Sequence, residues 1–229
     1  SCSLVGSEMC IRDRSHGDHS AVEKRHNILR DLEKEFSRPI CILADLQGPK
    51  LRCGDFKNAK LSLEAGQKFC FDLIERLGNK ERVYLPHPKI FQSVKKGDKL
   101  LIDDGKVAMQ VNKASEKKIE CTVLNDGIIS DKKGVNCPDS ILDLAPLTEK
   151  DKQDLEFVCG LGVDWIGLSF VQRAKDVVNV KKLLKGRAGI IAKIEKPAAV
   201  RVFDSIIDSA DGIMVARGDL GVELPIEAV

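Results

Sequence analysis

Residues 211–223 constrain this chain more than any other segment, because a short apolar run opens there into a glycine-flanked arginine and carboxylate. Residues 212–216 have the composition of a strand, and a purely structural strand rarely ends in such a group. In a parallel α/β fold, ligands bind at the carboxyl ends of the strands. The segment therefore predicts a functional site that contains Arg217, Gly218 and Asp219.

A second apolar run, residues 188–196, carries charged residues near its end. Side chains alternate between the two faces of a strand, so Lys193 and Glu195 share one face. An isolated pair of this kind is more often a surface ion pair, but a charge in an otherwise apolar parallel strand needs a partner or a function. If the two strands are neighbours, about 5 Å apart, Glu195 and Asp219 would jointly bind a hard divalent cation such as Mg2+, with Lys193 beside it.

The composition is typical of a globular protein that acts on small molecules. The chain has 229 residues and 43% apolar content, which is enough for a substantial core. Its 37 basic and 35 acidic residues leave a formal charge of +2, which does not indicate a nucleic-acid or membrane surface. No apolar run approaches the roughly 20 residues that span a bilayer, and no secretory pattern begins the chain. The eight cysteines contain no Cys-x-x-Cys pair, which predicts reduced thiols in the cytoplasm.

The first part of the chain changes from a helical pattern to a β pattern. Apolar residues at helical spacing predict a helix over residues 21–36, and an apolar run of strand type follows at residues 40–43. From residue 54 to about residue 143, short alternating segments are separated by turn signals such as Asp104-Gly105. This segment predicts a self-contained β domain of roughly ninety residues.

After Pro146 the pattern is one of alternating helices and strands. Thr148 and Asp151 have the spacing of a capping box at the start of a helix. Three strands are predicted after that helix, at residues 164–171, 190–195 and 212–216. Single helices are predicted between them, at residues 175–185 and 198–209. Such alternation is typical of a parallel sheet or barrel, so the β domain would be inserted after one of its strands.

Four motifs, in order along the chain, resemble signatures of the pyruvate kinase family. They are Ala-Asp-Leu-Gln-Gly-Pro-Lys-Leu-Arg at 44–52, Lys-Lys-Gly-Val-Asn-Cys-Pro at 132–138, Ile-Ala-Lys-Ile-Glu at 191–195, and residues 211–223. The resemblance runs from about Ser15 to Val229, and Leu46-Gln47 is similar to bacterial members, where others have Thr-Lys. It implies an α/β fold, a partial (β/α)8 barrel of TIM type with an inserted small β-barrel lid domain. It also implies the last step of glycolysis, phosphoryl transfer from phosphoenolpyruvate to ADP giving pyruvate and ATP.

The resemblance implies roles for the charged residues of the two strand ends. Glu195 and Asp219 would bind Mg2+ or Mn2+, and Lys193 would neutralise charge on the phosphoryl group during transfer. The backbone N–H groups of Gly218 and Asp219 would bind the substrate carboxylate, because glycine allows close approach of a backbone to a ligand.

A K+ site is also implied, together with two departures from the family pattern. Asp45, Ser15 and the carbonyl group of Leu46 resemble its ligands, and the ion would offset the negative charge of two phosphorylated substrates. The family has Arg-x-Asn-Phe before Ser-His-Gly, where the arginine contacts the phosphoryl group and the asparagine completes the K+ site. This chain has Ile11 and Asp13 at those two positions.

Nucleotide contacts are implied in both domains. Arg52 from the barrel and Lys133 from the lid resemble contacts to nucleotide phosphates, and His16 lies where the family touches the nucleotide. Taken alone, His16 reads as a solvated histidine and residues 132–133 as a solvated charge pair. Residues 103–105, Asp-Asp-Gly, read alone as a hairpin turn, although in this family the lid's aspartate approaches the closed site.

The resemblance sets expectations for the domain limits and the two ends. Residues 1–14 resemble translated sequencing adapter, so we expect a non-native segment there. We expect the barrel domain at 15–53 and 143–229 and the lid at 54–142, with about four of eight barrel strands present and the carboxyl-terminal regulatory domain absent. Two unpaired parallel edges would then make the chain, expressed alone, aggregate or fold only in its lid. The complete parent protein is expected to be a cytoplasmic homotetramer.

Two other functions stay open. A different barrel enzyme acting on phosphoenolpyruvate or a related keto acid would share the metal carboxylates, but it would not need the lid motif at 133–136. A non-catalytic module would hold nucleotide phosphates in its β domain, and ADP binding to residues 54–143 without turnover in a complete homologue would favour it. The fold alone does not decide between these functions, whereas the four motifs favour the kinase.

Overall fold

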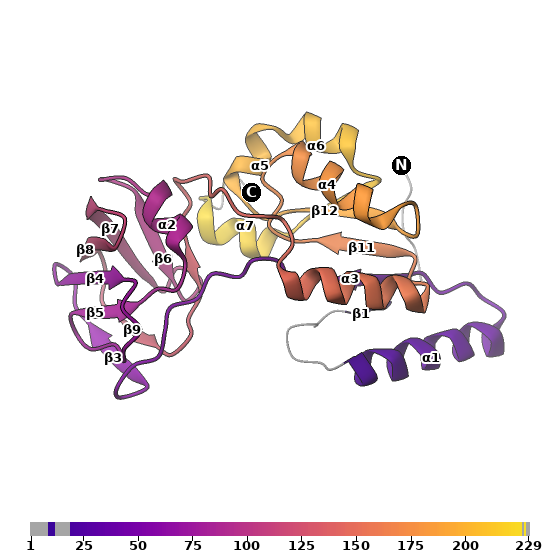
Figure 1. The fold of residues 1–229 in the computed structure, drawn as a ribbon, viewed down its shortest axis with the longest axis horizontal. Coiled ribbons are helices and arrows are strands. Elements are labelled where there is room, and N and C mark those ends of the chain that lie inside the picture. The colour runs from indigo at the N-terminus through magenta and orange to yellow at the C-terminus, as the bar shows by residue number, and fades with distance from the viewer. Residues whose placement is uncertain (1–8, 12–18, 226, 228–229) are drawn as a thin grey trace. The chain divides into compact units, whose positions relative to one another are not determined.

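The structure, a computed structural model, describes residues 9–11, 19–225 and 227. Its internal contacts separate it into two units (Figure 1). The first unit contains residues 1–49 and 145–216, and the second contains residues 50–144 and 217–229. The predicted domain limits at residues 53 and 143 stay a prediction.

The first unit contains one five-stranded sheet in which every neighbouring pair is parallel. Its strands, in spatial order, are β1 (Met9–Ile11), β2 (Ile42–Asp45), β11 (Trp165–Leu168), β12 (Gly189–Ile194) and β13 (Gly212–Val215). The predicted parallel sheet is thus confirmed. Because all the strands run the same way, their carboxyl ends meet at one edge of the sheet, and the residues that follow them are brought together.

Helices flank this sheet and join its strands. They are α1 (His19–Phe36), α3 (Glu149–Leu161), α4 (Ala174–Leu184), α5 (Pro197–Arg201) and α6 (Phe203–Ser209). Within this unit α1 packs against α3, and α4 against α6 (Figure 1). The capping box of Thr148 and Asp151 at the start of α3 is confirmed. No helix in the described part of the chain is long and apolar enough to cross a bilayer.

The single helix predicted at residues 198–209 is wrong, because the structure divides it into α5 and α6. Val202 ends the first helix and begins the second, with φ −124° and ψ 30°. Val200 and Val202 are β-branched, and such residues lose side-chain freedom in a helix. The break therefore falls where helix propensity is low.

The second unit consists of a six-stranded and a two-stranded sheet. The six strands, in spatial order, are β10 (Val135–Asn136), β6 (Lys99–Ile102), β7 (Val107–Ala114), β8 (Lys118–Val123), β4 (Lys68–Asp72) and β5 (Arg82–Tyr84). The other sheet pairs β3 (Lys60–Leu63) with β9 (Gly127–Ser130), and the unit's helices are α2 (Pro88–Ser93) and α7 (Arg217–Glu223). A cluster of buried side chains that runs from Leu51 to Leu142 forms the core of this unit. The predicted β segment therefore has a core of its own.

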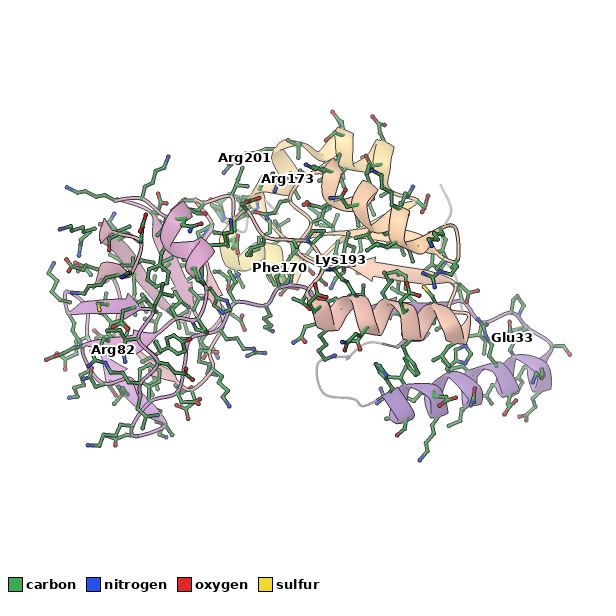
Figure 2. All side chains as sticks on the ribbon, viewed as in Figure 1. Glu33, Arg82, Phe170, Arg173, Lys193 and Arg201 are labelled. Carbon is green, nitrogen blue, oxygen red and sulfur yellow. The ribbon has the colours of Figure 1, made fainter. Side chains whose placement is uncertain are left out.

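Arg82 fixes the connection between β4 and β5 (Figure 2). Its guanidinium is buried and forms a two-pronged ion pair with Asp72. It also donates to the carbonyl oxygens of Ile74, at 2.8 Å, and Arg76, at 3.0 Å. Because the charge is paired and two further N–H groups donate to carbonyl oxygens, burial of the arginine is tolerated.

Candidate active site

Lys193 lies in a buried polar cluster at the carboxyl end of the parallel sheet (Figure 2). Its Nζ lies 3.0 Å and 3.1 Å from the two carboxylate oxygens of Asp45 and 2.9 Å from Oε1 of Glu195. It also donates to Oγ of Ser169 at 3.0 Å. Asp45 ends β2, Ser169 follows β11 and Glu195 follows β12, so three neighbouring strands supply the partners of one lysine.

The electrostatics of the cluster keep the lysine charged. Lys193 is 7% exposed and Glu195 is 5% exposed. Burial alone lowers the pKa of Lys193, but the negative charges of Glu195 and Asp45 outweigh burial and raise that pKa above its ordinary value. The side chain is therefore a fixed ammonium group at neutral pH. Removal of either carboxylate would leave the buried positive charge of Lys193 with only one negative partner among these two.

Ser169 was missed by sequence reasoning, although it lies within the predicted strand at residues 164–171. Its Oγ donates to the carbonyl oxygen of Leu46 at 2.7 Å and accepts from Lys193. The signal that could have found it is a single polar residue directly after the apolar run of β11. In the structure, the carbonyl group of Leu46, one of the predicted K+ ligands, is therefore bound by a serine hydroxyl.

Glu195 is held at both of its carboxylate oxygens. Oε1 pairs with Lys193, and Oε2 accepts a hydrogen bond of 2.8 Å from the backbone N–H of Phe170. Sequence reasoning missed Phe170 as well, because a backbone donor leaves no mark in the residue type. A buried carboxylate that is held in this way has a defined direction.

The strand that leads to Asp219 is the sheet neighbour of β12, as the divalent-cation hypothesis requires. Ile194 is paired with Val215, and the N–H of Ala216 donates to the carbonyl oxygen of Ile194 at 3.1 Å. Residues 217–223 then form the short helix α7. Gly218 and Asp219 lie in its first turn, where N–H groups have no partner within the helix. Because α7 belongs to the second unit, the pairing of Asp219 with Glu195 stays a prediction.

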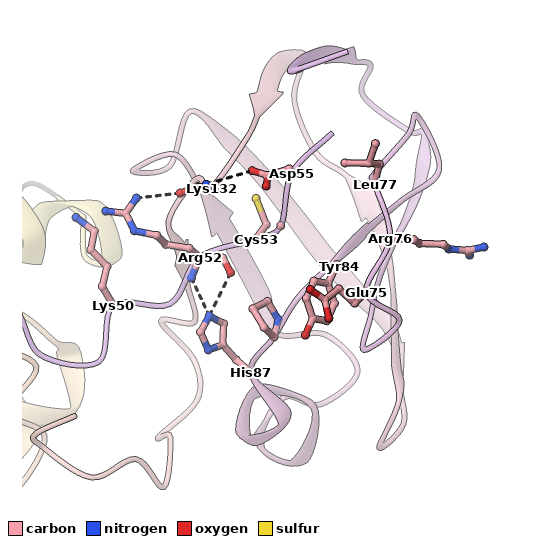
Figure 3. Close-up of a pocket in the computed structure, with 12 residues that line it drawn as sticks. Lys50, Arg52, Cys53, Asp55, Glu75, Arg76, Leu77, Tyr84, His87 and Lys132 are labelled. Atoms are coloured by element: carbon pink, nitrogen blue, oxygen red, sulfur yellow. Dashed lines mark hydrogen bonds and ion pairs between the residues drawn. The ribbon is translucent and has the colours of Figure 1, made fainter. Parts of the chain in front are cut away.

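In the second unit, Arg52 lines a pocket of about 570 Å3 (Figure 3). Its backbone N–H donates to Nε2 of His87 at 2.9 Å, and its Nη1 donates to the carbonyl oxygen of Lys132 at 2.9 Å. Burial lowers the pKa of His87, and the carbonyl oxygen of Arg52, 3.1 Å from the same Nε2, opposes this only in part. The histidine is therefore a neutral acceptor at pH 7, and Lys50 and Lys132 supply further positive charge to the pocket.

Lys133 is not among the residues that line this pocket. Its Nζ lies 2.9 Å from Oδ1 of Asp103, whose Oδ2 lies 3.0 Å from Nζ of Lys106. Asp103 and Asp104 are in the left-handed region, with φ of 51° and 57°, in the turn between β6 and β7. Burial alone raises the pKa of Asp103, but the hydrogen bonds from Lys133 and Lys106 bring that pKa below its ordinary value. The predicted hairpin turn is confirmed, and its aspartate binds Lys133.

Several predicted residues near the start of the chain lie outside the described residues. These are the K+ ligand Ser15, the nucleotide contact His16 and the departure at Asp13. The other departure, Ile11, is part of β1 and is paired with Ala44 of β2. That residues 1–14 are not native protein stays a prediction.

The parallel sheet has flanking helices and gathers a lysine, a serine and two carboxylates at the carboxyl ends of its strands. This arrangement is typical of the class of barrel-type α/β enzymes. The profile of the barrel domain of pyruvate kinase matches residues 5–229. Pyruvate kinases of Methylorubrum extorquens and Agrobacterium vitis are 46% and 48% identical to the chain over 98% and 99% of its length. The crystal structure of a pyruvate kinase from Cryptosporidium parvum matches 93% of the chain with a TM-score of 0.88 and 34% identity. This chain belongs to the pyruvate kinase family.

The chain spans about half the length of the relatives it matches. It covers 47% and 48% of the two bacterial proteins and 46% of the Cryptosporidium chain. The predicted fold class is confirmed: an α/β fold with part of a (β/α)8 barrel and an inserted small β domain. The predicted family is confirmed by the same comparisons.

Proposed function

We propose that the protein is a phosphotransferase that moves the phosphoryl group of phosphoenolpyruvate to ADP and so forms pyruvate and ATP. The observation that carries this proposal is the buried ammonium group of Lys193, fixed between Glu195 and Asp45 at the carboxyl end of the sheet in a member of the pyruvate kinase family. Phosphoryl transfer depends on preorganised positive charge around the group in transfer. A lysine on a strand, held by three partners, supplies that charge without reorganisation.

A divalent cation, Mg2+ or Mn2+, fits the carboxylates that the chain offers. Among the described residues no group of three His, Cys, Asp or Glu side chains could hold a metal ion unaided. Mg2+, however, is usually bound by one or two carboxylates together with waters and substrate phosphates, and Glu195 and Asp219 would be those two. When bound, the ion would offset negative charge on the phosphate oxygens.

The chain's own groups would do the remaining work. Lys193 would neutralise charge on the phosphoryl group, and the N–H groups of Gly218 and Asp219 would bind the substrate carboxylate. Asp45 orients Lys193, and with the carbonyl group of Leu46 and with Ser15 it would provide hard oxygen ligands for K+. Both ions are part of this proposal.

The second unit would bind ADP. We propose that Arg52 and Lys133 contact its phosphates, and Lys133 would then exchange its ion pair with Asp103 for a phosphate oxygen. His16, from the other part of the chain, would contact the nucleotide. The substrates are small molecules, and neither nucleic acid nor a membrane is an expected partner. We also propose that the complete protein acts in the cytoplasm as a homotetramer.

Phosphorus NMR of the purified complete protein with phosphoenolpyruvate, ADP, Mg2+ and K+ tests this function. We expect the phosphoenolpyruvate signal to be replaced by the three signals of ATP, and we expect excess EDTA to stop the conversion. A folded protein that binds ADP and forms no ATP under these conditions would contradict the proposal.

That second outcome would favour the alternative of a non-catalytic nucleotide-binding module. The observation in its favour is that the second unit has its own core and a pocket lined by Lys50, Arg52 and Lys132. Turnover of phosphoenolpyruvate without ADP would instead favour another barrel enzyme that acts on this or a related keto acid.

A further inference from the structure

Phe170, which binds Glu195 through its backbone, has a conformation that bulky residues rarely adopt. Its φ of 56° lies in the left-handed region. Such a conformation costs free energy and persists only where the surrounding structure determines it; such residues gather at functional sites. The hydrogen bond of 2.8 Å from its N–H to Oε2 of Glu195 places this strained residue directly behind the carboxylate.

Gly48 allows Phe170 to occupy this position. A Cβ atom at residue 48 would lie 2.8 Å from Cδ2 of Phe170 and 3.2 Å from Cβ of Ser169. Real Cβ atoms essentially never approach a ring carbon at the first of these distances, so the ring would have to move. The ammonium group of Lys196 lies 5.3 Å from the centroid of the same ring, a cation–π distance. The ring is therefore in contact with two parts of the chain.

Asp151 fixes Gly48 in turn. Oδ1 of Asp151 accepts a hydrogen bond of 3.1 Å from the N–H of Gly48, and Oδ2 accepts from the N–H and hydroxyl of Thr148 at 2.9 Å and 2.6 Å. Asp151 is only 1% exposed. One buried carboxylate thus joins the loop after β2 to the start of α3, and a capping box by itself would not require the contact with Gly48.

We propose that Asp151, Gly48 and Phe170 form a positioning chain that sets the direction of the Glu195 carboxylate toward its cation. The proposal rests on the cation-binding role of Glu195 proposed above. With Oε1 held by Lys193 and Oε2 by Phe170, the carboxylate is fixed at both oxygens before any cation binds. Groups that orient a metal ligand typically change metal affinity by about 10- to 100-fold when they are altered.

The test is the dissociation constant of Mn2+, measured from the electron paramagnetic resonance signal of the free ion in the presence of the purified complete protein. Gly48→Ala is expected to raise this constant about tenfold, because the new Cβ displaces Phe170 and its N–H. Gly162→Ala is the matched control: Gly162 also has a left-handed φ, 78°, but a Cβ there meets nothing within 4 Å. It is expected to change the constant less than about twofold.

Phe170→Gly keeps the proposal testable if Gly48→Ala does not fold. Glycine adopts positive φ freely, so this variant removes the ring without adding strain, and the loosened N–H is expected to weaken Mn2+ binding several-fold. Equal Mn2+ affinity of the wild type, Gly162→Ala and both of these variants would overturn the positioning chain.

Glu195→Gln separates the two proposals. If Glu195→Gln binds Mn2+ much more weakly while Gly48→Ala and Phe170→Gly bind it as the wild type does, the positioning chain is overturned and the cation role of Glu195 is kept. Unchanged Mn2+ binding in Glu195→Gln would overturn both the cation role of Glu195 and the chain built on it. Loss of affinity in all three variants and not in Gly162→Ala is the expected result.

Discussion

At the scale of single residues, Lys193 and Glu195 were predicted from the sequence, whereas Ser169, despite its place directly after an apolar run, and Phe170 were not. Charges that interrupt an apolar strand are visible in the sequence and imply partners. The partners themselves depend on which strands are neighbours and in what register, for example Gly167 of β11 beside Asp45 of β2. No local pattern encodes that pairing, so the contact that a serine or a backbone N–H makes with a neighbouring strand is found only in the structure.

Lys193→Met is expected to lower kcat at least about 100-fold, a loss of the size seen when a preorganised electrostatic group is removed. Lys193→Arg should recover little, because the guanidinium is larger and the cluster is buried. Lys182→Met, an exposed lysine of α4, is the control and should retain wild-type kcat. Near-normal phosphorus NMR turnover in Lys193→Met would show that the fixed ammonium group is dispensable.

The ion pair of Asp103 with Lys133 makes a pH-dependent contribution to stability. The folded pKa of Asp103 is below its ordinary value, so the contribution is present above the unfolded pKa of about 3.9 and lost as pH falls through the folded pKa. Asp103→Asn should therefore cost about 0.5–1 kcal/mol at pH 7, and the difference from wild type should vanish near pH 2.

Urea unfolding at pH 7 and at pH 2–3 measures this difference. Asp104→Asn is the matched control, because Asp104 is the adjacent left-handed aspartate of the same turn. It should change stability by less than about 0.5 kcal/mol. A cost of Asp103→Asn that is the same at both pH values would rule out the ion pair as its cause.

At the scale of elements, local signals predicted the start of α3, whereas no local signal indicated α7. The capping box of Thr148 and Asp151 is a local signal, and it begins α3 in the structure. Residues 217–223 contain two glycines, which disfavour a helix by about 1 kcal/mol each. Tertiary contacts outweigh that cost, since Leu220 is buried and Asn136 donates to Glu223 at 2.7 Å. Such contacts join segments far apart in the chain and are not readable from propensity.

Thr148→Ala removes the hydroxyl that caps α3 by accepting from the N–H of Asp151. It should lower the free energy of unfolding by about 1 kcal/mol, and Thr148→Ser should recover most of that loss. Ser205→Ala, which removes an exposed hydroxyl on α6, serves as the control in the same urea titrations. An equal loss in Ser205→Ala would mean that the cap contributes nothing specific.

At the scale of the whole molecule, the sequence predicted a parallel sheet interrupted by a β domain, and both are present. The predicted domain limits stay a prediction, and the internal contacts group residues 217–229 with residues 50–144. In the first unit, β13 lies at an edge of the sheet, and large apolar side chains of the helices are exposed, among them Leu183 and Ile207. An exposed edge and apolar surface favour self-association, which agrees with the expectation for the chain expressed alone.

Residues 50–144 should fold alone, since the buried core that runs from Leu51 to Leu142 lies within them. We expect a soluble monomer with one cooperative urea transition. Phe71→Ala, at a fully buried site, should destabilise it by about 3–5 kcal/mol. The 229-residue chain, expressed in the same way, should self-associate. A fragment that shows no cooperative transition would contradict the claim that residues 50–144 fold alone. A soluble, monomeric 229-residue chain would contradict the expected self-association.

The most direct test of the central claim is a crystal of the Mn2+-loaded protein, with diffraction data collected at the manganese absorption edge. The account predicts an anomalous peak bound by the carboxylates of Glu195 and Asp219, with the ammonium group of Lys193 nearby. A manganese peak on other side chains, with no manganese bound to Glu195, would contradict it.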